Sequence, residues 1–334
     1  MAKKKTFLEN ITEEFEDAFD SILVNEETDS KVEVIPTSSV SLNTSIGVGG
    51  IPKGKFTEIF GPESAGKTTL VLDICKNALA LNGKILYLDP EHGMNYEYTK
   101  QIIGDYDEAN LIILQPDTAE DCFRLAEEGI SSGEFSLIIL DSIGALAPQK
   151  EKEDKFEDSQ VSLLPRLISK FLRRNHHNVK VNNVAMVFIN QLRDKIGAYI
   201  KTYDTPGGHA LKHIASLRIY LYAGDKIKDS DKEIIGNAVE FTIKKNKLAA
   251  PLKTFNFPLI FGKGIDSVKD TVNFATKLGI IQVRGPYYSF EDTKLGQGSV
   301  EASRTLYENP ELLDKINKMC YNIVNIKEGE EKDE

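Results

Sequence analysis

Between Val32 and Asp141, short apolar runs alternate with longer segments whose hydrophobic residues have helical spacing. Helical patterns occupy residues 69–81 and 120–131, and four runs with the length of buried strands cover residues 55–60, 84–89, 111–114 and 137–141. Alternating strands and helices predict an α/β fold with a mostly parallel central sheet flanked by helices. In this architecture ligands bind at the carboxyl ends of the strands.

The second half of the chain continues with helices and strands. An apolar run at 184–190 predicts another buried strand, and 216–222 and 239–245 alternate as two more, with a polar turn at 224–231 between them. Residues 162–175 predict an amphipathic helix whose apolar side consists of Leu163, Leu164, Leu167, Ile168, Phe171 and Leu172.

From Ser267 onward the pattern is that of a smaller unit. We expect a helix at 267–278, a strand-rich piece at 280–290, a turn at 296–298 and a final helix at 310–326, which together make an α/β domain of about sixty residues. The predicted organisation is an N-terminal helix and linker at 1–31, a core at 32–266, this small domain at 267–326 and an acidic, disordered tail at 327–334.

The N-terminal segment has an apolar stripe at three- and four-residue steps, which predicts an amphipathic helix. Two interpretations stay open: the helix packs on its own domain, or it docks on a neighbouring copy of the chain. The stripe consists of Phe7, Leu8, Ile11, Phe15, Phe19, Ile22 and Leu23.

The composition is that of a globular protein, with 41% hydrophobic and 28% charged residues among 334. No apolar run reaches 18 residues, and acidic residues rather than an apolar segment follow the first lysines, so we expect neither a membrane span nor a signal peptide. The three cysteines, Cys75, Cys122 and Cys320, lie far apart in apolar contexts, which favours buried thiols in a reducing cytoplasm.

The net charge of −10 is unevenly distributed. Residues 1–30 hold nine acids against three lysines, whereas residues 159–217 hold nine Lys and Arg against two acids and also contain four of the five histidines. A basic island in an acidic chain is an electrostatic footprint for phosphate.

The most specific motif matches G-x-x-x-x-G-K-[ST] between a predicted strand and a predicted helix. Its two glycines let the backbone N–H groups surround phosphate oxygens, and the following helix directs its positive N-terminus to the same anion. Lys67 adds a charge for the β and γ phosphates, and the Thr68 hydroxyl is placed to hold Mg²⁺. The motif therefore predicts a nucleoside triphosphate site formed by Gly61, Pro62, Glu63, Ser64, Ala65, Gly66, Lys67 and Thr68, with Thr69 next to it.

Acidic residues follow two of the predicted strands. Asp141 comes after four apolar residues, as a carboxylate that orients Mg²⁺ requires, although a strand-terminal Asp can also cap a turn. Asp89 and Glu91 follow the strand at 84–89, and Glu91 is the better placed general base for an attacking water.

The basic island coincides with the helix at 162–175 and the loop after it. Arg166, Ser169, Lys170 and Arg173 recur on the polar side of that helix, and residues 192–208 form a long basic loop. A solvated basic face is the simpler interpretation of the helix alone. A helix flanked by two loops, the charged segment 151–160 and this one, can instead follow a nucleic-acid backbone.

These motifs together resemble the bacterial and phage RecA-type recombinases over about residues 33–326. The resemblance rests on the phosphate loop and on collinear segments at 89–92, 115–118, 140–142, 188–191, 195–197, 207–212, 245–251 and 294–298. It implies a RecA-like P-loop ATPase core that uses ATP and Mg²⁺. It also implies a DNA-dependent ATPase that assembles with itself as a helical filament on single-stranded DNA and exchanges strands with homologous double-stranded DNA.

The resemblance also implies residue roles. Glu91 would activate the hydrolytic water, Gln191 would sense the γ-phosphate, Tyr98 would stack on adenine, and Lys245 and Lys247 would reach the ATP of an adjacent subunit. This last role replaces the expectation that the lysines belong to a solvated edge strand. Loops 153–161 and 192–208 would contact DNA, and the DNA-binding residues would be Arg166, Ser169, Arg173, Arg193, Ile196, Gly207, Gly208, His209 and Lys212.

The functional hypothesis is therefore a cytoplasmic recombinase for DNA recombination, damage repair and the SOS response, with single-strand-binding and loader proteins as possible partners. A regulatory relative that binds ATP and DNA without exchanging strands is one alternative, and a helicase motor is another. The sequence departs from the family pattern at Ala65, where Ser is common and which the backbone cradle should tolerate. The other departures, Asp194, Ile200, His209 and His213, concern the second loop rather than the ATP site.

Overall fold

The computed structural model describes residues 32–153, 163–194 and 203–330. The chain divides into two compact units, Met1–Glu33 and Val34–Glu334, and the following concerns the second. The predicted N-terminal helix, most of the predicted loop at 153–161 and the last four residues of the tail lie outside the described residues.

A nine-stranded sheet is the centre of this unit, in the order β13-β12-β11-β10-β3-β7-β6-β4-β5. All neighbouring pairs from β10 to β5 are parallel, whereas β11, β12 and β13 pair antiparallel at the other edge. The predicted mostly parallel sheet is confirmed. Its strands are β3 (Lys55–Gly61), β4 (Lys84–Leu88), β5 (Leu111–Leu114), β6 (Phe135–Leu140), β7 (Ala185–Gln191), β10 (Leu217–Lys228), β11 (Ile234–Asn246), β12 (Thr254–Ile260) and β13 (Gly264–Ile265).

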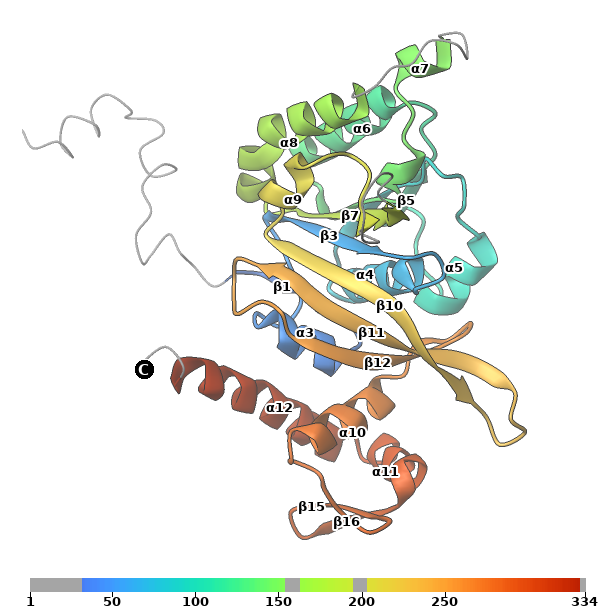
Figure 1. The fold of residues 1–334 in the computed structure, drawn as a ribbon, viewed down its shortest axis with the longest axis vertical. Coiled ribbons are helices and arrows are strands. Elements are labelled where there is room, and N and C mark those ends of the chain that lie inside the picture. The colour runs from blue at the N-terminus through green and yellow to red at the C-terminus, as the bar shows by residue number, and fades with distance from the viewer. Residues whose placement is uncertain (1–31, 154–162, 195–202, 331–334) are drawn as a thin grey trace, which may run out of the picture. The chain divides into compact units, whose positions relative to one another are not determined.

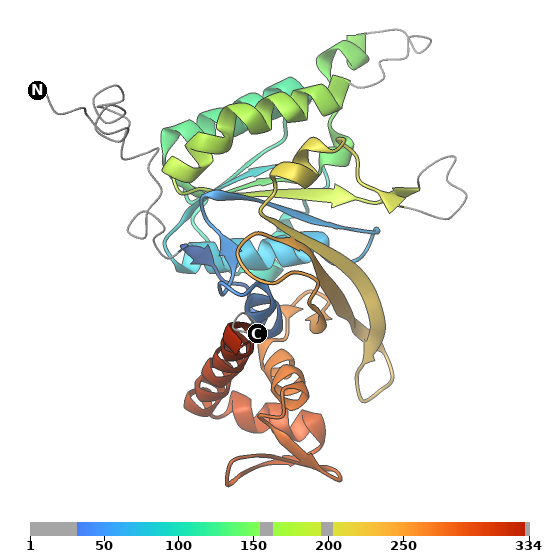
Figure 2. The same cartoon turned by 60° about the vertical axis from the view of Figure 1, so that its left-hand side comes forward.

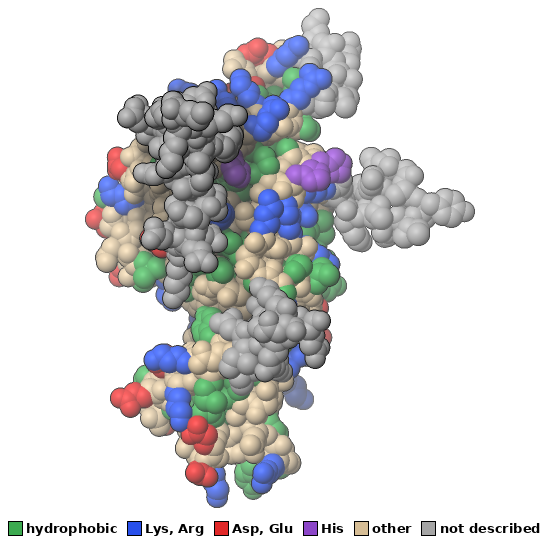
Figure 3. Space-filling view, turned by 90° about the vertical axis from the view of Figure 1, so that its left-hand side faces the viewer, with side chains coloured by type: hydrophobic (Ala, Val, Ile, Leu, Met, Phe, Trp, Pro, Cys, Tyr) green, Lys and Arg blue, Asp and Glu red, His purple; other side chains and the backbone are tan. Residues whose placement is uncertain are grey.

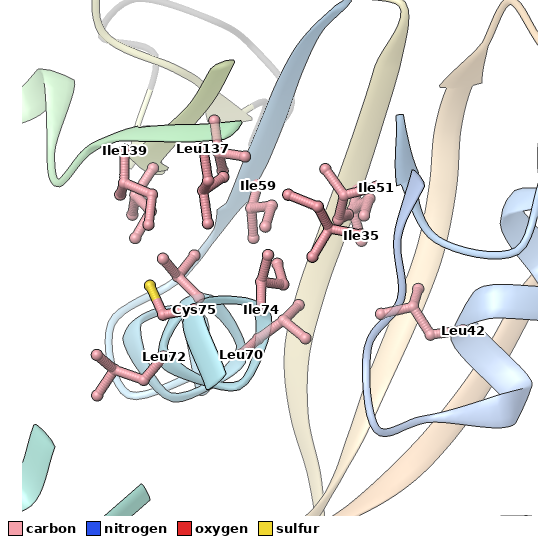
Figure 4. Packing of buried hydrophobic residues seen from close by; sticks show 14 of the residues in the cluster. Ile35, Leu42, Ile51, Ile59, Leu70, Leu72, Ile74, Cys75, Leu137 and Ile139 are labelled. Carbon is pink, nitrogen blue, oxygen red and sulfur yellow. The ribbon is translucent and has the colours of Figure 1, made fainter. Parts of the chain in front are cut away.

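Helices cover both faces of the parallel strands, as Figures 1 and 2 show. One face carries α6 (Ala119–Ser132), α8 (Leu163–Val181) and the short α9 (Ala210–Ile214), and the other carries α4 (Lys67–Ala80) and α5 (Tyr96–Ile103). Successive residues of a strand point to opposite faces. Accordingly, Leu137 and Ile139 of β6 pack with α4 (Figure 4), whereas Ile138 and Leu140 pack with α6 and α8.

The antiparallel strands β10 and β11 form a longer hairpin than the sequence predicted. The expected turn at 224–231 is wrong, because β10 continues to Lys228 and β11 begins at Ile234. Only Leu217–Tyr220 of β10 pairs with β3, so the ribbon continues past β3 (Figure 2), where β12 still pairs with Gly236–Thr242 of β11. Strand β11 lies between β10 and β12, but β12 pairs only with its residues 236–242, and at the lysine end the printed ladder pairs are with β10.

The small C-terminal unit contains α10 (Ser267–Lys277), the three-stranded sheet β14 (Gln282–Arg284), β15 (Tyr287–Phe290) and β16 (Thr293–Gln297), α11 (Gly298–Tyr307) and α12 (Pro310–Glu330). Two expectations need correction: the predicted turn at 296–298 is the end of β16 and the start of α11, and residues 327–330 of the expected tail belong to α12.

Short elements complete the unit. They are β1 (Val34–Ile35), α3 (Val40–Ile46), β2 (Ile51–Pro52), the 3-10 helix η1 (Ile143–Ala145), α7 (Gln149–Glu153), β8 (Arg193–Asp194) and β9 (Tyr203–Asp204). Helix α3 joins the core of the large sheet to the core of the small C-terminal unit, because its Val40 packs with the apolar residues of α10, α11 and α12. Within the described part of the chain, every helix is too short or too polar to span a bilayer.

Candidate functional site

The phosphate loop connects β3 to α4, as predicted. Gly61 lies so close to β10 that a Cβ atom there would sit 2.2 Å from the Leu221 carbonyl oxygen. Gly66 has a φ of +85°, and a Cβ atom on it would sit 2.9 Å from Leu259 Cδ1. Both glycines are therefore required by the local geometry, and the loop between them leaves Glu63 and Ser64 exposed and Ala65 buried.

Lys67, the first residue of α4, folds back over this loop. Its Nζ donates hydrogen bonds to the carbonyl oxygens of Gly61, at 3.1 Å, and Pro62, at 2.6 Å. Burial lowers the pKa of the ammonium, and the charges of Asp141, Glu91 and Glu63 oppose that effect. A bound anion would favour the charged ammonium and so offset the effect of burial on its pKa. The geometry therefore suits a phosphate ligand.

Asp141 follows β6 and lies next to Thr68, as the motif predicted. The Thr68 hydroxyl donates to Asp141 Oδ2 at 3.2 Å, and the Tyr87 hydroxyl donates to the same oxygen at 2.7 Å. Burial raises the pKa of this carboxyl to about 6, the two hydrogen bonds lower it, and the charges of Glu91 and Asp89 raise it further. A buried carboxylate beside a hydroxyl is a fitting partial site for Mg²⁺.

No group of three or more His, Cys, Asp or Glu residues in the described part of the chain could hold a metal ion by itself. This agrees with Mg²⁺ chemistry, because the ion commonly takes one or two protein ligands and completes its shell with phosphate oxygens and water. The residues present therefore fit Mg²⁺ carried in with a triphosphate.

The two acids that follow β4 differ in burial and in hydrogen-bond partners. Asp89 is buried and accepts hydrogen bonds from the backbone N–H groups of Gly93 and Met94 and from Gln115 Nε2, so its carboxylate holds the turn after the strand. Glu91 is exposed and lines the cavity, and its carboxylate accepts hydrogen bonds from the Ser142 hydroxyl at 3.0 Å and Gln191 Nε2 at 3.5 Å.

These groups line one cavity of about 590 Å³, within the usual size range of small-molecule sites. Tyr98 lines it from α5 and its hydroxyl lies 2.6 Å from the Thr69 hydroxyl. The sequence interpretation missed Tyr87 in β4 and an apolar wall from β11 and β12 that ends in Phe261, which is 51% exposed. A signal for Phe261 existed, because the aromatic residue stands between an apolar run and Gly262.

Lys245 and Lys247 do not line this cavity. Lys245 Nζ donates to the carbonyl oxygens of Lys212 and His213 in α9, at 2.8 and 2.6 Å, and burial lowers its pKa with help from the charge of Lys247. The Lys247 side chain is exposed at the end of β11, and its backbone N–H bonds to Ser216. Within one chain these lysines therefore lie away from the phosphate loop.

The polar side of α8 carries the predicted basic stripe. Arg166, Lys170, Arg173, His177 and Lys180 are exposed at steps of three and four residues, and Ser169 is half-buried among them. Figure 3 shows Lys, Arg and His side chains gathered on the part of the surface that α8 and α9 occupy. The apolar side of the helix packs on the sheet as predicted, although the helix runs on to Val181.

The second loop begins and ends in an ordered stem. Strands β8 and β9 pair Arg193 with Asp204, and Gly207 and Gly208 follow. His209, which is exposed, directly precedes α9, and Lys212 within α9 is partly buried. The backbone of Arg193 is described but its side chain is not, and Ile196 lies outside the described residues.

Comparison with known proteins extends over almost the whole chain. Residues 3–266 match the family model of the RecA N-terminal domain, and residues 269–323 match that of the RecA C-terminal domain. The chain is 39% identical over 298 residues to Protein RecA of Bacteroides thetaiotaomicron, which covers 89% of each chain. It is 40% identical over 289 residues to Protein RecA of Aquifex aeolicus, covering 86% of this chain and 83% of the relative. The match to Protein RecA of Clostridioides difficile is 38% identical over 309 residues and covers 92% and 88%.

Proposed function

This chain belongs to the RecA family, and from that premise we propose that it is an ATP-dependent DNA recombinase. It assembles on single-stranded DNA as a helical filament, pairs that strand with homologous duplex DNA and hydrolyses ATP in response to DNA. The observation that carries the proposal is the convergence of a phosphate loop, a Thr68–Asp141 pair and a Glu91–Gln191 pair on one cavity.

Binding of ATP uses the loop and both ends of the cavity. The loop N–H groups and Lys67 hold the β and γ phosphates, and Tyr98 and Phe261 provide aromatic surface for the base. Thr68 and Asp141 would hold Mg²⁺, which would neutralise negative charge on the phosphates. Lys67 must then exchange its two loop carbonyls for phosphate oxygens, which is favourable because an ion pair replaces neutral partners.

Hydrolysis depends on the pair formed by Glu91 and Gln191. Glu91 accepts the proton of the attacking water, for which it is better suited than Asp89, since three donors already occupy the Asp89 carboxylate. Gln191 lies within reach of Glu91 and senses whether a γ-phosphate is present.

Subunit contact and DNA contact complete the proposal. Lys245 and Lys247 lie outside the nucleotide cavity of their own chain, which supports a role at the nucleotide of the next subunit.

The DNA surface consists of the stripe on α8, the stem glycines, His209 and Lys212, together with Arg193 and Ile196. Contacts to the phosphate backbone leave the bases free for pairing, so we expect little sequence preference. Single-strand-binding and loader proteins are the proposed accessory partners in the cytoplasm.

A strand-exchange assay tests the function directly. Purified protein, single-stranded circular DNA, ATP and Mg²⁺ are mixed with a linear homologous duplex or, as the matched control, a non-homologous duplex of equal length. We expect joint molecules and displaced strand only with the homologous duplex. DNA-stimulated ATP hydrolysis without joint molecules would point to a regulatory relative, and strand separation independent of homology would point to a helicase.

A further inference from the structure

The Tyr87 hydroxyl reaches the nucleotide cavity from inside the sheet. Tyr87 lies near the carboxyl end of β4, is 1% exposed and packs in the apolar cluster that includes the buried side of α4. Strand β4 pairs with β6 in a register that places Tyr87 beside Ile139, two residues before Asp141. Side chains two residues apart on a strand point to the same face. The long Tyr87 side chain therefore reaches along this face to Asp141, and its hydroxyl donates to Oδ2 at 2.7 Å.

Asp141 is held by β4 through its backbone as well as its side chain. Its backbone N–H donates to the Leu88 carbonyl oxygen at 2.9 Å, and its Oδ2 accepts from the Tyr87 hydroxyl. Two consecutive residues of one strand thus fix where Asp141 lies and which way its carboxylate points. A Phe at position 87 would keep the ring in the core but would supply no donor for Oδ2.

The two hydroxyls that bond to Asp141 differ in their freedom to move. Thr68 is exposed and donates over the longer distance of 3.2 Å, whereas the buried Tyr87 ring cannot turn away without repacking the core. Thr68 is also a proposed ligand of Mg²⁺, so its hydroxyl has a second partner in the loaded site. Within the part of the chain that the structure describes, both donors bond to Oδ2, so Oδ1 keeps its lone pairs for the hydration shell of a cation.

We infer that Tyr87 is a positioning residue that holds the Asp141 carboxylate in place for the magnesium ion of a bound nucleoside triphosphate. This inference rests on the proposed function and deepens it, because it explains how one carboxylate can serve the ion without further acidic ligands from the described residues. A carboxylate that is already oriented loses less conformational freedom when the ion arrives. Groups that orient the partners of a metal ion in this way commonly contribute 10–100-fold to its affinity.

The test measures binding rather than hydrolysis. The affinity for fluorescent mant-labelled adenylyl-imidodiphosphate is determined without DNA, once in saturating Mg²⁺ and once in EDTA, and the ratio of the two dissociation constants gives the magnesium effect. We expect a wild-type magnesium effect on the order of 10², within the range typical of coupled binding. For Tyr87→Phe it should be about 10-fold smaller. The affinity in EDTA should stay close to that of wild type, because Tyr87 bonds to Asp141 rather than to the phosphate loop.

A matched control is Tyr321→Phe. Tyr321 lies in α12, is partly buried, and its phenol forms a hydrogen bond with the Asn43 side chain. The same hydroxyl is thus removed from a site outside the nucleotide cavity, and the magnesium effect should not change. A wild-type magnesium effect in Tyr87→Phe, or an equal loss in Tyr321→Phe, would overturn the inference.

Two further variants separate the hydroxyl from the packing. Tyr87→Met, whose flexible side chain can fill the same space, covers the case in which Tyr87→Phe does not fold, and it should show the same loss. Tyr87→para-aminophenylalanine returns an N–H donor to the end of the ring, and it should recover most of the magnesium effect. A wild-type magnesium effect in Tyr87→Met, or no recovery with the amine, would overturn the inference. If Mg²⁺ does not change nucleotide binding by the wild-type protein, the proposed function fails and this inference fails with it.

Discussion

Replacing Asp270 by Asn should make the protein more stable at neutral pH. Asp270 lies in α10, fully buried, and fixes the start of α3 to the C-terminal unit. Its carboxylate accepts from Ser39 Oγ at 2.8 Å, Ser41 Oγ at 2.7 Å and the Ser41 backbone N–H at 3.0 Å. These partners are hydroxyl and amide dipoles, so burial dominates and raises the pKa of the carboxyl to about 6.

The magnitude follows from that pKa. An Asp in an unfolded chain has a pKa of about 3.9, so the folded state holds the proton more tightly by about two units, or about 3 kcal/mol. The ionised carboxylate therefore lowers the free energy of unfolding. This loss is complete above pH 6 and becomes progressively smaller as the pH falls toward 4. Asn removes that charge and keeps the contacts, because its Oδ1 accepts from Ser39 and the Ser41 N–H while its Nδ2 donates to Ser41 Oγ.

The assay is urea unfolding at pH 7.5, 6.0 and 4.5, followed by far-ultraviolet circular dichroism because the chain has no Trp. We expect Asp270→Asn to raise the free energy of unfolding by up to about 3 kcal/mol at pH 7.5 and by only about 1 kcal/mol at pH 4.5. The control is Asp266→Asn on the same helix, since Asp266 is the N-cap residue and Asn caps equally well. A variant less stable than wild type at pH 7.5, or a difference independent of pH, would refute the reasoning.

Three further predictions concern the nucleotide. Lys67→Ala should abolish DNA-stimulated ATP hydrolysis, because the β and γ phosphates lose their point charge; full activity in a phosphate-release assay would remove the phosphate-loop assignment. Glu91→Gln should bind ATP normally and hydrolyse it about 10²–10⁴-fold more slowly, leaving persistent filaments, and normal turnover in the same assay would exclude Glu91 as the base. Lys245→Ala should leave ATP binding by single subunits intact but weaken nucleotide-dependent assembly in sedimentation velocity; unchanged assembly would place the subunit contact elsewhere.

The sequence predicted where the phosphate loop and Asp141 lie in the fold, because the signals for both are local. An apolar run of four residues must deliver Asp141 to the carboxyl edge of the sheet, and the glycine spacing predicts the loop that faces it. The choice between Asp89 and Glu91 needed the structure only to show that the carboxylate of Asp89 is already occupied.

Features that depend on contacts across the sheet could not be predicted. The continuous apolar run of β4 indicates that Tyr87 is buried, but not that its hydroxyl meets Asp141 at the end of the neighbouring strand β6. Residues 224–228 of β10 are polar or only partly buried, so they lack the alternation of a half-buried strand and were interpreted as a turn. The buried hydrogen bond from Asn190 Nδ2 to Glu58 Oε1 likewise joins residues that lie 132 positions apart in the chain.

Electron microscopy of the purified protein with single-stranded DNA, Mg²⁺ and a non-hydrolysable ATP analogue tests most directly whether bound nucleotide joins subunits into a DNA-binding filament. We expect continuous helical filaments with the analogue and far fewer with ADP. Protein that remains monomeric on the DNA at saturating analogue and Mg²⁺ would contradict the proposed bridge between subunits.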